Sequence, residues 1–565
     1  MEPEWRVLEE DERAEELSKA MGLPPVFGQL LINRGVQSEA EAERFLYPSL
    51  GNLSDPFLMK GMEEGVERMV KAILSGEGVT VFGDYDVDGI TSVALLKHFL
   101  ASAGLKVDHY IPKRLEEGYG LNVEAVQEIA SRGTGLLVTV DCGISDREEI
   151  ALARDLGMDV IVLDHHEPPD DLPRAVIINP MQRDCPYPFK GLAGVGVTFA
   201  FVMALRRRLR ELGHWRRFKE PNLKRYLDLV ALGTVADIVP VTGENRILLK
   251  FGLKELQETE RPGLIALKEV SGLNQSPIGY GQVAFRLAPR INAGGRMQRE
   301  EVPLKLLLTD DPSEARRLAG ELEEANRQRQ AIQEKVYREA REMALKGLSE
   351  AALVLSSEGW HPGVIGIVAS KLAEEFWRPT ILIAIEGEEG KGSARSIPEI
   401  HLREALDFCR HHLLAFGGHR LAAGLKVRRE DISPLRDAFC RAVKEVLGGA
   451  EPVPLLYIDA ELPLKEITPR FVQMLELLHP FGPGNPRPLF CCPGEVHFEG
   501  LRRFNNGVTR FSVRDESGRW EAIAFSGFED LPTRGKIAFY PTMEEWEGYK
   551  RLLLEVRALK ASDGP

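Results

Sequence analysis

Three carboxylates follow an apolar stretch within the segment Val79–Ser92, VTVFGDYDVDGITS. Asp84, Asp86 and Asp88 are spaced two residues apart. In an extended backbone, side chains at this spacing leave on the same face. Like charges held close together are unfavourable unless a cation compensates them, so the spacing predicts a site for a divalent metal ion.

Further apolar runs contain acidic residues and histidines in the same way. They are Asp141 in GLLVTVD, Asp164, His165 and His166 in MDVIVLDHH, and Asp237 in GTVADIVP. A single aspartate in such a place is usually a helix cap or a turn residue. Four such sites in one chain favour a shared ligand instead.

These residue types indicate the chemistry. Oxygen-rich sites with one or two imidazoles suit Mg²⁺ or Mn²⁺ better than Zn²⁺. Paired ions of this kind, about 3.5 to 4 Å apart, activate water and stabilise a leaving oxygen in phosphoryl transfer. We therefore expect hydrolysis of a phosphoester or phosphoanhydride. Neighbouring residues of an extended backbone point to opposite sides, so His165 and His166 are expected to differ in role, one ligating metal and the other contacting phosphate or donating a proton.

The composition is that of a soluble globular protein, with 44% hydrophobic and 28% charged residues. No stretch approaches the roughly 20 apolar residues of a membrane helix, and the acidic start does not resemble a secretory signal, so a cytoplasmic protein without membrane contact is expected. The six cysteines form no C-x-x-C pair, which argues against a zinc ribbon or a disulfide framework. The net charge of −14 argues against indiscriminate nucleic-acid binding.

The chain of 565 residues is too long for one core, so several domains must position these residues. Short helices are expected over 1–75. A lobe is expected over 76–310. In its first part, from Gly78 to the Pro/Gly-rich segment CPYPFKGLAGVG, apolar strands alternate with helices; they predict a parallel sheet covered on both faces, with ligands beyond the carboxyl ends of the strands, and mainly helices follow to about residue 310. A polar helix of roughly ten turns over 311–348, too sparse in apolar positions for a coiled coil, joins this α/β lobe to a smaller one over 349–450. Short alternating strands over 451–565 predict a small β-barrel.

The motifs GDYDVDG, VTVDCG, LDHHE and GTVADIVP, in this order, resemble the DHH phosphoesterase family and, within it, the RecJ group of single-stranded-DNA exonucleases. The segments RINAGGRM, HPGVIGIVASK, GSARS and FGGHRLAAG are similar to those of DHHA1 domains. Each motif alone is moderately specific, whereas the ordered set is very specific. The resemblance runs over nearly the whole chain and implies a DHH lobe, a DHHA1 lobe and a barrel resembling an OB-fold.

The resemblance also implies roles for individual residues around two Mn²⁺ or Mg²⁺ ions. The expected metal ligands are Asp86, Asp88, Asp141, His165 and Asp237. Asp84, His166 and Arg296 are expected to be catalytic, with Arg296 reaching the scissile phosphate. The alternative for Asp84 is a cap of the turn before the helix at Ile90.

Residues that bind substrate are implied in both lobes: Arg114 and Tyr119 at the 5′ phosphate and terminal nucleotide, Asn292 beside Arg296, Ser393 and Arg395 at a phosphate, and His361 and His419 along the strand. Simpler alternatives exist for most of them. Arg114 and Tyr119 could be solvated surface residues, His361 could only cap the following helix, and His419 could be a buried structural histidine.

Two other features have alternative explanations. The basic run Leu205–Lys219 could bind DNA or form a solvated helix face. The aromatic residues Phe504, Phe511 and Trp520 of the barrel could stack on bases, as OB-folds commonly do, or could belong to the core.

The expected function is a metal-dependent exonuclease that degrades single-stranded DNA from its 5′ end to mononucleotides, by attack of a metal-activated water, in recombination and repair. A strand with a 5′ end is the expected partner, with single-strand-binding protein and a helicase as further partners, and a monomer is expected. The rival activities are an oligoribonuclease, a cyclic-dinucleotide phosphodiesterase or a pyrophosphatase of the same family. A rival from another class is a catalytically inactive scaffold that binds single strands.

Overall fold

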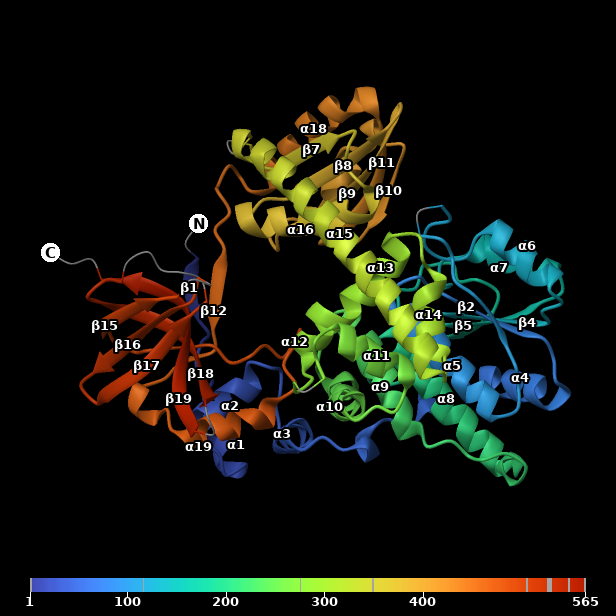
Figure 1. Ribbon diagram of the computed structural model, residues 1–565, viewed down its shortest axis with the longest axis horizontal. Helices are drawn as coiled ribbons and strands as arrows, with labels where there is room; N and C mark the ends of the chain where they lie inside the picture. Colours follow the sequence, from blue (N-terminus) through green and yellow to red (C-terminus); the bar gives the residue numbers. More distant parts are fainter. Residues whose placement is uncertain are drawn as a thin grey trace. The chain divides into compact units, whose positions relative to one another are not determined.

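The computed structural model divides the chain into two units (Figure 1). It describes residues 3–114, 116–274, 276–347, 350–504, 507–525, 531–546 and 549–562. The first unit comprises residues 1–3, 56–237 and 254–454, and the second comprises residues 4–55, 238–253 and 455–565. The helical segment expected over 1–75 is therefore divided between the units rather than forming one extension.

The first unit contains a five-stranded parallel sheet, as the alternation of apolar strands and helices predicts. The strand order is β3-β2-β4-β5-β6, and β2 and β4 are buried along their whole length. Helices α6 and α7 lie on one side of the sheet and α4, α5 and α8 on the other (Figure 1). The strands are β2 (Val79–Gly83), β3 (Asp108–Tyr110), β4 (Leu136–Val140), β5 (Asp159–Leu163) and β6 (Val176–Ile178), and the helices are α4 (Met62–Ser75), α5 (Val87–Ser102), α6 (Val123–Ser131), α7 (Arg147–Asp155) and α8 (Gly194–Glu211).

Helices follow this sheet along the chain. The longest, α15 (Pro312–Lys346), begins where Asp311 accepts a hydrogen bond from the backbone N–H of Ser313 and where Pro312 occupies the first turn. It packs against α11, α13 and α14, and then against α16 and β7 of the smaller lobe. It therefore connects two lobes, as predicted. The remaining elements are α9 (Leu227–Ala236), α11 (Pro262–Val270), α12 (Tyr280–Gln282), the π-turn η5 (Val283–Leu287), α13 (Ala288–Arg296) and α14 (Glu301–Leu308), while α10 (Gly243–Gln257) belongs to the second unit up to Leu253.

The smaller lobe of the first unit is a mixed five-stranded sheet of order β10-β11-β9-β8-β7. Only the β7–β8 pair is parallel among the four pairs of this sheet. Its two apolar faces are covered by α15 and α16 on one side and by α17 and α18 on the other. The elements are β7 (Leu353–Ser357), α16 (Pro362–Phe376), β8 (Thr380–Glu386), β9 (Glu389–Arg395), α17 (Leu402–Phe408), β10 (Ala415–Gly418), β11 (Ala422–Arg428) and α18 (Ile432–Val446).

The second unit is built around a closed barrel, because β18 pairs with β15 and β19 while β16 and β17 complete the circuit. The N-terminal strand β1 pairs in parallel with β12, and the first helices add apolar side chains such as Phe27 and Phe45 to the barrel core. This packing explains why residues 4–55 belong here. The elements are β1 (Glu4–Val7), α1 (Arg13–Ala20), α2 (Pro25–Ile32), α3 (Glu39–Leu46), β12 (Leu455–Ile458), β13 (Ala460–Glu461), α19 (Pro469–Leu475), β14 (Phe490–Cys491), β15 (Val496–Arg503), β16 (Thr509–Asp515), β17 (Gly518–Ala524), β18 (Arg534–Trp546) and β19 (Tyr549–Ala561).

The structure decides between the alternatives for two features that could contact nucleic acid. Phe511 is a core residue, 2% exposed, so the core alternative holds for it. Trp520 packs against the same core, whereas Phe504 is half exposed. In the basic run at the end of α8, Arg206 pairs with Glu220 at 2.7 Å and Arg208 with Glu211 at 3.1 Å. The run is therefore largely an ion-paired helix face.

None of the helices within the described residues is both long and apolar enough to cross a membrane.

A candidate metal centre at the carboxyl edge of the parallel sheet

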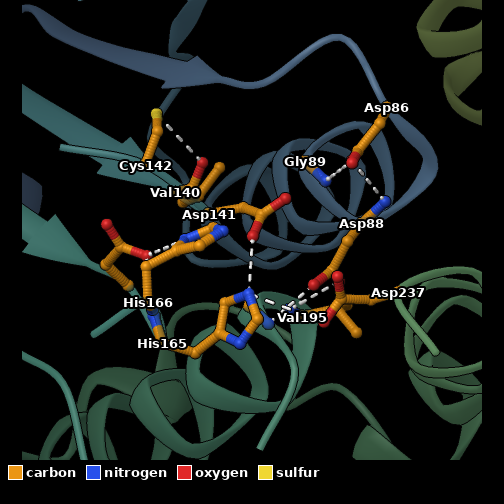
Figure 2. A network of polar contacts seen from close by, with 12 residues as sticks. Asp86, Asp88, Gly89, Val140, Asp141, Cys142, His165, His166, Val195 and Asp237 are labelled. Atoms are coloured by element: carbon orange, nitrogen blue, oxygen red, sulfur yellow. Dashed lines mark hydrogen bonds and ion pairs between the residues drawn. The ribbon is translucent and has the colours of Figure 1, made fainter. Parts of the chain in front are cut away.

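The acidic residues and histidines singled out by sequence meet at one edge of the parallel sheet (Figure 2). Asp84 follows β2, Asp141 follows β4, and His165 and His166 lie beyond β5, while Asp237 follows α9. The carboxyl ends of neighbouring parallel strands lie side by side. Segments separated by up to about 150 positions thus supply one cluster.

The local geometry of the first three carboxylates differs from the expectation. They do not share one extended strand, because helix α5 begins at Val87. Asp86 caps this helix, accepting hydrogen bonds from the N–H groups of Asp88 (2.9 Å) and Gly89 (3.1 Å). Asp84 is therefore not the cap, and Asp88 lies in the first helical turn.

The donor atoms of the cluster lie close enough to share cations. Three overlapping groups have potential ligand atoms within 4.8 Å of one another: Asp84, Asp86 and Asp141; Asp141, His165 and His166; and Asp88, His165 and Asp237. His165 Nε2 lies 3.1 Å from Asp141 Oδ1 and 3.5 Å from Asp237 Oδ2. Asp141 and His165 each belong to two groups, so the geometry suits more than one ion.

Four buried atoms of the cluster have no hydrogen-bond partner: Asp84 Oδ1, Asp141 Oδ1, His165 Nε2 and Asp237 Oδ2. Buried polar atoms of folded proteins almost always have one. Carboxylate oxygens together with an imidazole nitrogen are donors that Mn²⁺ and Mg²⁺ accept. The residues present therefore fit divalent cations of this class.

The pKa values of these groups also indicate a site for cations. Burial, strengthened by neighbouring carboxylates, raises the pKa of Asp88 to about 7 and that of Asp237 to about 9. The same causes raise the pKa of Asp84 and Asp141 well above their ordinary value. Burial lowers the pKa of His165 to about 4, so this imidazole is neutral and keeps a lone pair for a metal. Full ionisation of the carboxylates requires compensating positive charge.

Glycines make room for the carboxylates. A Cβ at Gly194 would lie 2.7 Å from Asp141 Oδ1, and one at Gly233 would lie 2.7 Å from Asp88 Oδ1. The first N–H groups of α8 also donate to Asp88, from Gly194 at 2.7 Å and from Val195 at 2.9 Å. A helix N-terminus stabilises a carboxylate in this way. Asp88 is thereby fixed in orientation.

Asp141 has an unusual backbone conformation, with φ of 61°. Residues other than glycine rarely adopt this left-handed conformation, and strain of this kind concentrates at functional sites. The hydroxyl of Tyr119 donates to the Asp141 carbonyl at 3.2 Å and lies 3.2 Å from His166 Nδ1. The ring of Tyr119 is half exposed and meets His166 edge-on. This side chain therefore connects the loop between β3 and α6 to the cluster.

Asp164 belongs to the same cluster but is not among the ligands or catalytic residues expected from the sequence. Its buried Oδ1 accepts hydrogen bonds from the backbone N–H of His165 (2.7 Å) and His166 (3.1 Å) and from His166 Nδ1 (2.8 Å), and its Oδ2 accepts one from Ile144 N–H (3.0 Å). Burial is the largest influence and opposes ionisation of Asp164, but the hydrogen bonds from His166 and the charges of both histidines together outweigh it and keep the Asp164 pKa below its usual value. For His166, burial would lower the pKa, but the hydrogen bond to Asp164 and the charges of Asp164, Asp88 and Asp86 together raise it. Its position in LDHHE was the available signal.

The two histidine rings are neighbours rather than pointing to opposite sides. Their centroids are 4.4 Å apart at an interplanar angle of 51°, because β5 ends at Leu163 and the backbone is no longer extended. Their partners nevertheless differ. His165 faces Asp141 and Asp237, whereas His166 is bonded to Asp164.

Arginines from both lobes of the first unit gather near one another. Arg296 Nη1 donates to the Gly363 carbonyl at 2.7 Å. Burial and the positive charges of Arg114, Arg329 and Arg395 lower the pKa of Arg296 to about 9. Such a concentration of like charge favours a bound anion. Arg114 also lies over the ring of Tyr85, 4.7 Å from its centroid.

The smaller lobe places the other residues expected at the substrate as follows. Arg395 Nη1 donates to Ser393 Oγ at 3.1 Å, and a Cβ at Gly366 of α16 would lie 2.9 Å from that oxygen. His361 Nδ1 accepts from Gly363 N–H at 3.0 Å, so the capping alternative is observed. His419 is exposed in the turn between β10 and β11, which excludes a buried structural role.

Asn292 lies in α13, one turn before Arg296. Its Oδ1 is buried and has no hydrogen-bond partner. Buried amide oxygens normally accept a hydrogen bond, so the Asn292 oxygen is free to accept one from a bound substrate.

Comparisons with known proteins agree over the length of the chain. Family models match the DHH family N-terminal domain at residues 78–234, the DHHA1 domain at 349–446 and the RecJ OB domain at 458–558. The single-stranded-DNA-specific exonuclease RecJ of Escherichia coli is 40% identical, over 87% of this chain and 87% of the relative. That of Bacillus subtilis is 38% identical, over 99% of this chain and 71% of the relative. The crystal structure of Thermus thermophilus RecJ in complex with Mn²⁺ matches with a TM-score of 0.84 at 33% identity, over 99% of this chain and 80% of that one.

Proposed function

Because this chain belongs to the RecJ group of the DHH phosphoesterase family, we propose that it hydrolyses single-stranded DNA from the 5′ end and releases mononucleotides. It is a metal-dependent exonuclease specific for single strands. The observation that carries this conclusion is the set of unpartnered buried donors at the carboxyl edge of the parallel sheet, facing the arginines of the same unit.

The metal ligands follow from the cluster. Two Mn²⁺ or Mg²⁺ ions would be held by Asp86, Asp88, Asp141, His165 and Asp237, with Asp84 and His166 at the edge of the same cluster. Relatives solved with Mn²⁺ and with Mg²⁺ support this assignment. When bound, such ions polarise the phosphoryl oxygens and lower the pKa of a water nucleophile.

The side chains of the protein have separate tasks around the substrate. Arg296, which donates to the Gly363 carbonyl of the smaller lobe, would neutralise the scissile phosphate, while Arg114, Ser393 and Arg395 would hold the 5′ phosphate. The planar guanidinium group allows bidentate contact with a phosphate. The 5′ polarity is inferred from membership of the RecJ group.

His166 holds a proton at a defined atom. Its Nδ1 donates to Asp164, which fixes the tautomer and ring orientation. Its Nε2 is then the ring atom that can contact a phosphate oxygen or exchange a proton with it. Asp84, buried and with a raised pKa, lies near enough to modulate the charge of the cluster.

The cellular setting is also a proposal. An enzyme restricted to single strands needs a source of unpaired DNA, so a helicase and a single-strand-binding protein are suitable partners in recombination and repair. The relatives are bacterial proteins, and bacterial DNA lies in the cytoplasm. All six cysteines are free thiols, as such a compartment favours. We propose that the protein acts there as a monomer.

The test compares three 5′-phosphorylated substrates: a single strand of a few tens of nucleotides, the same strand in a duplex, and a dinucleotide. With Mn²⁺, we expect mononucleotides from the single strand only, with a 5′ label released before a 3′ label. Asp237→Asn should abolish this activity, whereas Asp170→Asn, at an exposed position, should not. Cleavage of the dinucleotide alone would favour the short-substrate activities of the family. Strand binding by wild type without cleavage would favour an inactive scaffold.

A further inference from the structure

We propose that Phe285 is a stacking platform for a base of the strand on the 3′ side of the scissile phosphate. This inference rests on the proposed function and adds a binding residue outside the metal centre and the phosphate pocket. Its occupant is a base of single-stranded DNA, recognised by its flat face.

The exposure of Phe285 is unusual. Its side chain is 81% exposed, the highest value among the large apolar side chains of the described residues. A single exposed apolar residue needs no explanation by itself. The backbone conformation at Phe285 and the residues around it are the reasons to assign it a binding role.

The backbone at Phe285 is a π-turn. In η5, the N–H of Ala288 donates to the carbonyl of Val283, one residue farther back than in an α-helix. Pro289 follows and lacks an N–H, and the Arg286 carbonyl accepts a hydrogen bond from Arg290 Nη1 at 2.6 Å. Single π-turns within helices are frequent at functional sites.

The π-turn leaves the ring of Phe285 open to solvent. One residue is inserted into the helical turn, so side chains before and after it are displaced around the axis. The residue beneath the ring is Gly281, where an added Cβ would lie 4.0 Å from Phe285 Cδ2. With no side chain at Gly281, an aromatic face is available to a partner.

The same helical run leads to the proposed site. The π-turn packs against α9, and the hydroxyl of Tyr280 donates to the Val235 carbonyl at 3.5 Å, two residues before Asp237. In the other direction the run continues into α13, which carries Asn292 and Arg296. At about 1.5 Å per residue, Phe285 lies roughly 15 Å along this axis from Arg296. A strand held at Arg296 would therefore reach Phe285 only beyond its first nucleotides.

The chemistry next to Phe285 suits a nucleic acid strand. Arg286 is exposed beside it, whereas Arg290 in the next turn is largely buried and pairs with Glu323 at 2.6 Å, so Arg286 is the cation available there. Proteins that hold single strands combine aromatic faces for the bases with cationic groups for the backbone. An aromatic ring beside an arginine therefore favours a nucleotide over an apolar protein segment as the occupant.

The experiment measures KM and kcat of Phe285→Ala on a 5′-phosphorylated 20-mer, with Leu74→Ala as the control at another exposed apolar position. Loss of one stacked base predicts a KM for the 20-mer raised roughly tenfold, with kcat little changed. A much shorter substrate, a 5′-phosphorylated trinucleotide, should show no such change. Phe285→Trp should restore KM, and in an Asp237→Asn background its added fluorescence should be quenched by the 20-mer.

An unchanged KM of Phe285→Ala on the 20-mer would overturn this inference while the proposed function stands, provided that wild type releases mononucleotides. An equal loss on the trinucleotide would also overturn it, because the effect would then come from the site itself. Failure of wild type to cleave the 20-mer would instead reject the proposed function.

Discussion

His165 Nε2 lies 3.1 Å from Asp141 Oδ1, and neither atom has a hydrogen-bond partner of good geometry. The two residues come from the ends of neighbouring strands, and the imidazole is neutral because burial lowers the His165 pKa to about 4. Two lone-pair-bearing atoms this close are unfavourable unless a proton or a cation lies between them. This contact is therefore the most direct sign of a metal site in the chain.

Asp141→Asn should separate the charge of this residue from its backbone role. Asparagine tolerates a positive φ, so the strained turn is retained while one anionic ligand is lost. We expect activity with Mn²⁺ to fall roughly 10³-fold, the effect of losing several kcal/mol of transition-state stabilisation. In chelator, relief of repulsion should raise the melting temperature relative to wild type. Metal titration by calorimetry and thermal melts would check both effects, and full activity with normal Mn²⁺ affinity would contradict the assignment.

Gly194→Ala should weaken metal binding without removing any ligand. The added methyl group would lie 2.7 Å from Asp141 Oδ1, so the carboxylate must move. We expect the Mn²⁺ concentration for half-maximal activity to rise about tenfold, as for loss of groups that orient ligands. The matched control is Gly320→Ala in α15, where nothing lies within 4 Å. It should leave activity unchanged and stabilise the helix by up to about 1 kcal/mol.

Asp164→Asn should disturb His166 while leaving every proposed metal ligand in place. The amide oxygen of the variant can still accept hydrogen bonds from the histidines. Its NH₂ group would then face the N–H of Ile144, which in the wild type donates to Asp164. We expect kcat to fall about 10- to 100-fold, with a smaller change in KM for DNA. A normal kcat in steady-state assays would show that the orientation of His166 is unimportant.

His98→Gln tests the packing of α5, the helix that carries Asp86 and Asp88. His98 Nε2 lies 3.1 Å from the carbonyl of Leu307 in α14, and burial lowers the His98 pKa to about 4. The folded state therefore binds fewer protons than the unfolded state between about pH 6.5 and 4. The stability of wild type should be fully present above this window and fall as the pH drops through it.

The measurement is the difference in melting temperature between His98→Gln and wild type across this pH range. Glutamine keeps a donor for the Leu307 carbonyl but cannot titrate, so the variant should lose less stability on acidification. His411→Gln, at an exposed position, is the control. Parallel pH profiles for all three proteins would contradict the role of His98.

The sequence predicted those parts of the fold that depend on local patterns. Apolar strands alternating with helices predicted the parallel sheet, and the polar run after Asp311 predicted α15. Local patterns did not predict that Ile238–Leu253 belongs to the second unit. Arg246, buried without a carboxylate partner among the described residues, donates to the carbonyls of Phe45 and Leu478. Partners so distant in the chain leave no local signal.

For the site, residue type and position within or after an apolar run were enough to select the carboxylates that meet in the cluster, although Asp237 follows a helix rather than a strand. They were not enough to distinguish Asp164 from Asp84, because both follow apolar strands. The difference lies in their surroundings. Asp164 accepts hydrogen bonds from two loops, whereas Asp84 retains an unpartnered oxygen. Only the folded chain supplies those donors.

The second unit joins the two ends of the polypeptide: β1 pairs with β12, and Arg34 donates to Asn485, 451 residues away. During synthesis the first helices leave the ribosome long before their partners exist. At about 5 to 20 residues per second, the delay is roughly 20 to 90 s. Apolar side chains such as Phe27 and Phe45 cannot enter the barrel core before the strands of the barrel exist, so this core is completed only after residues 4–454 have been synthesised.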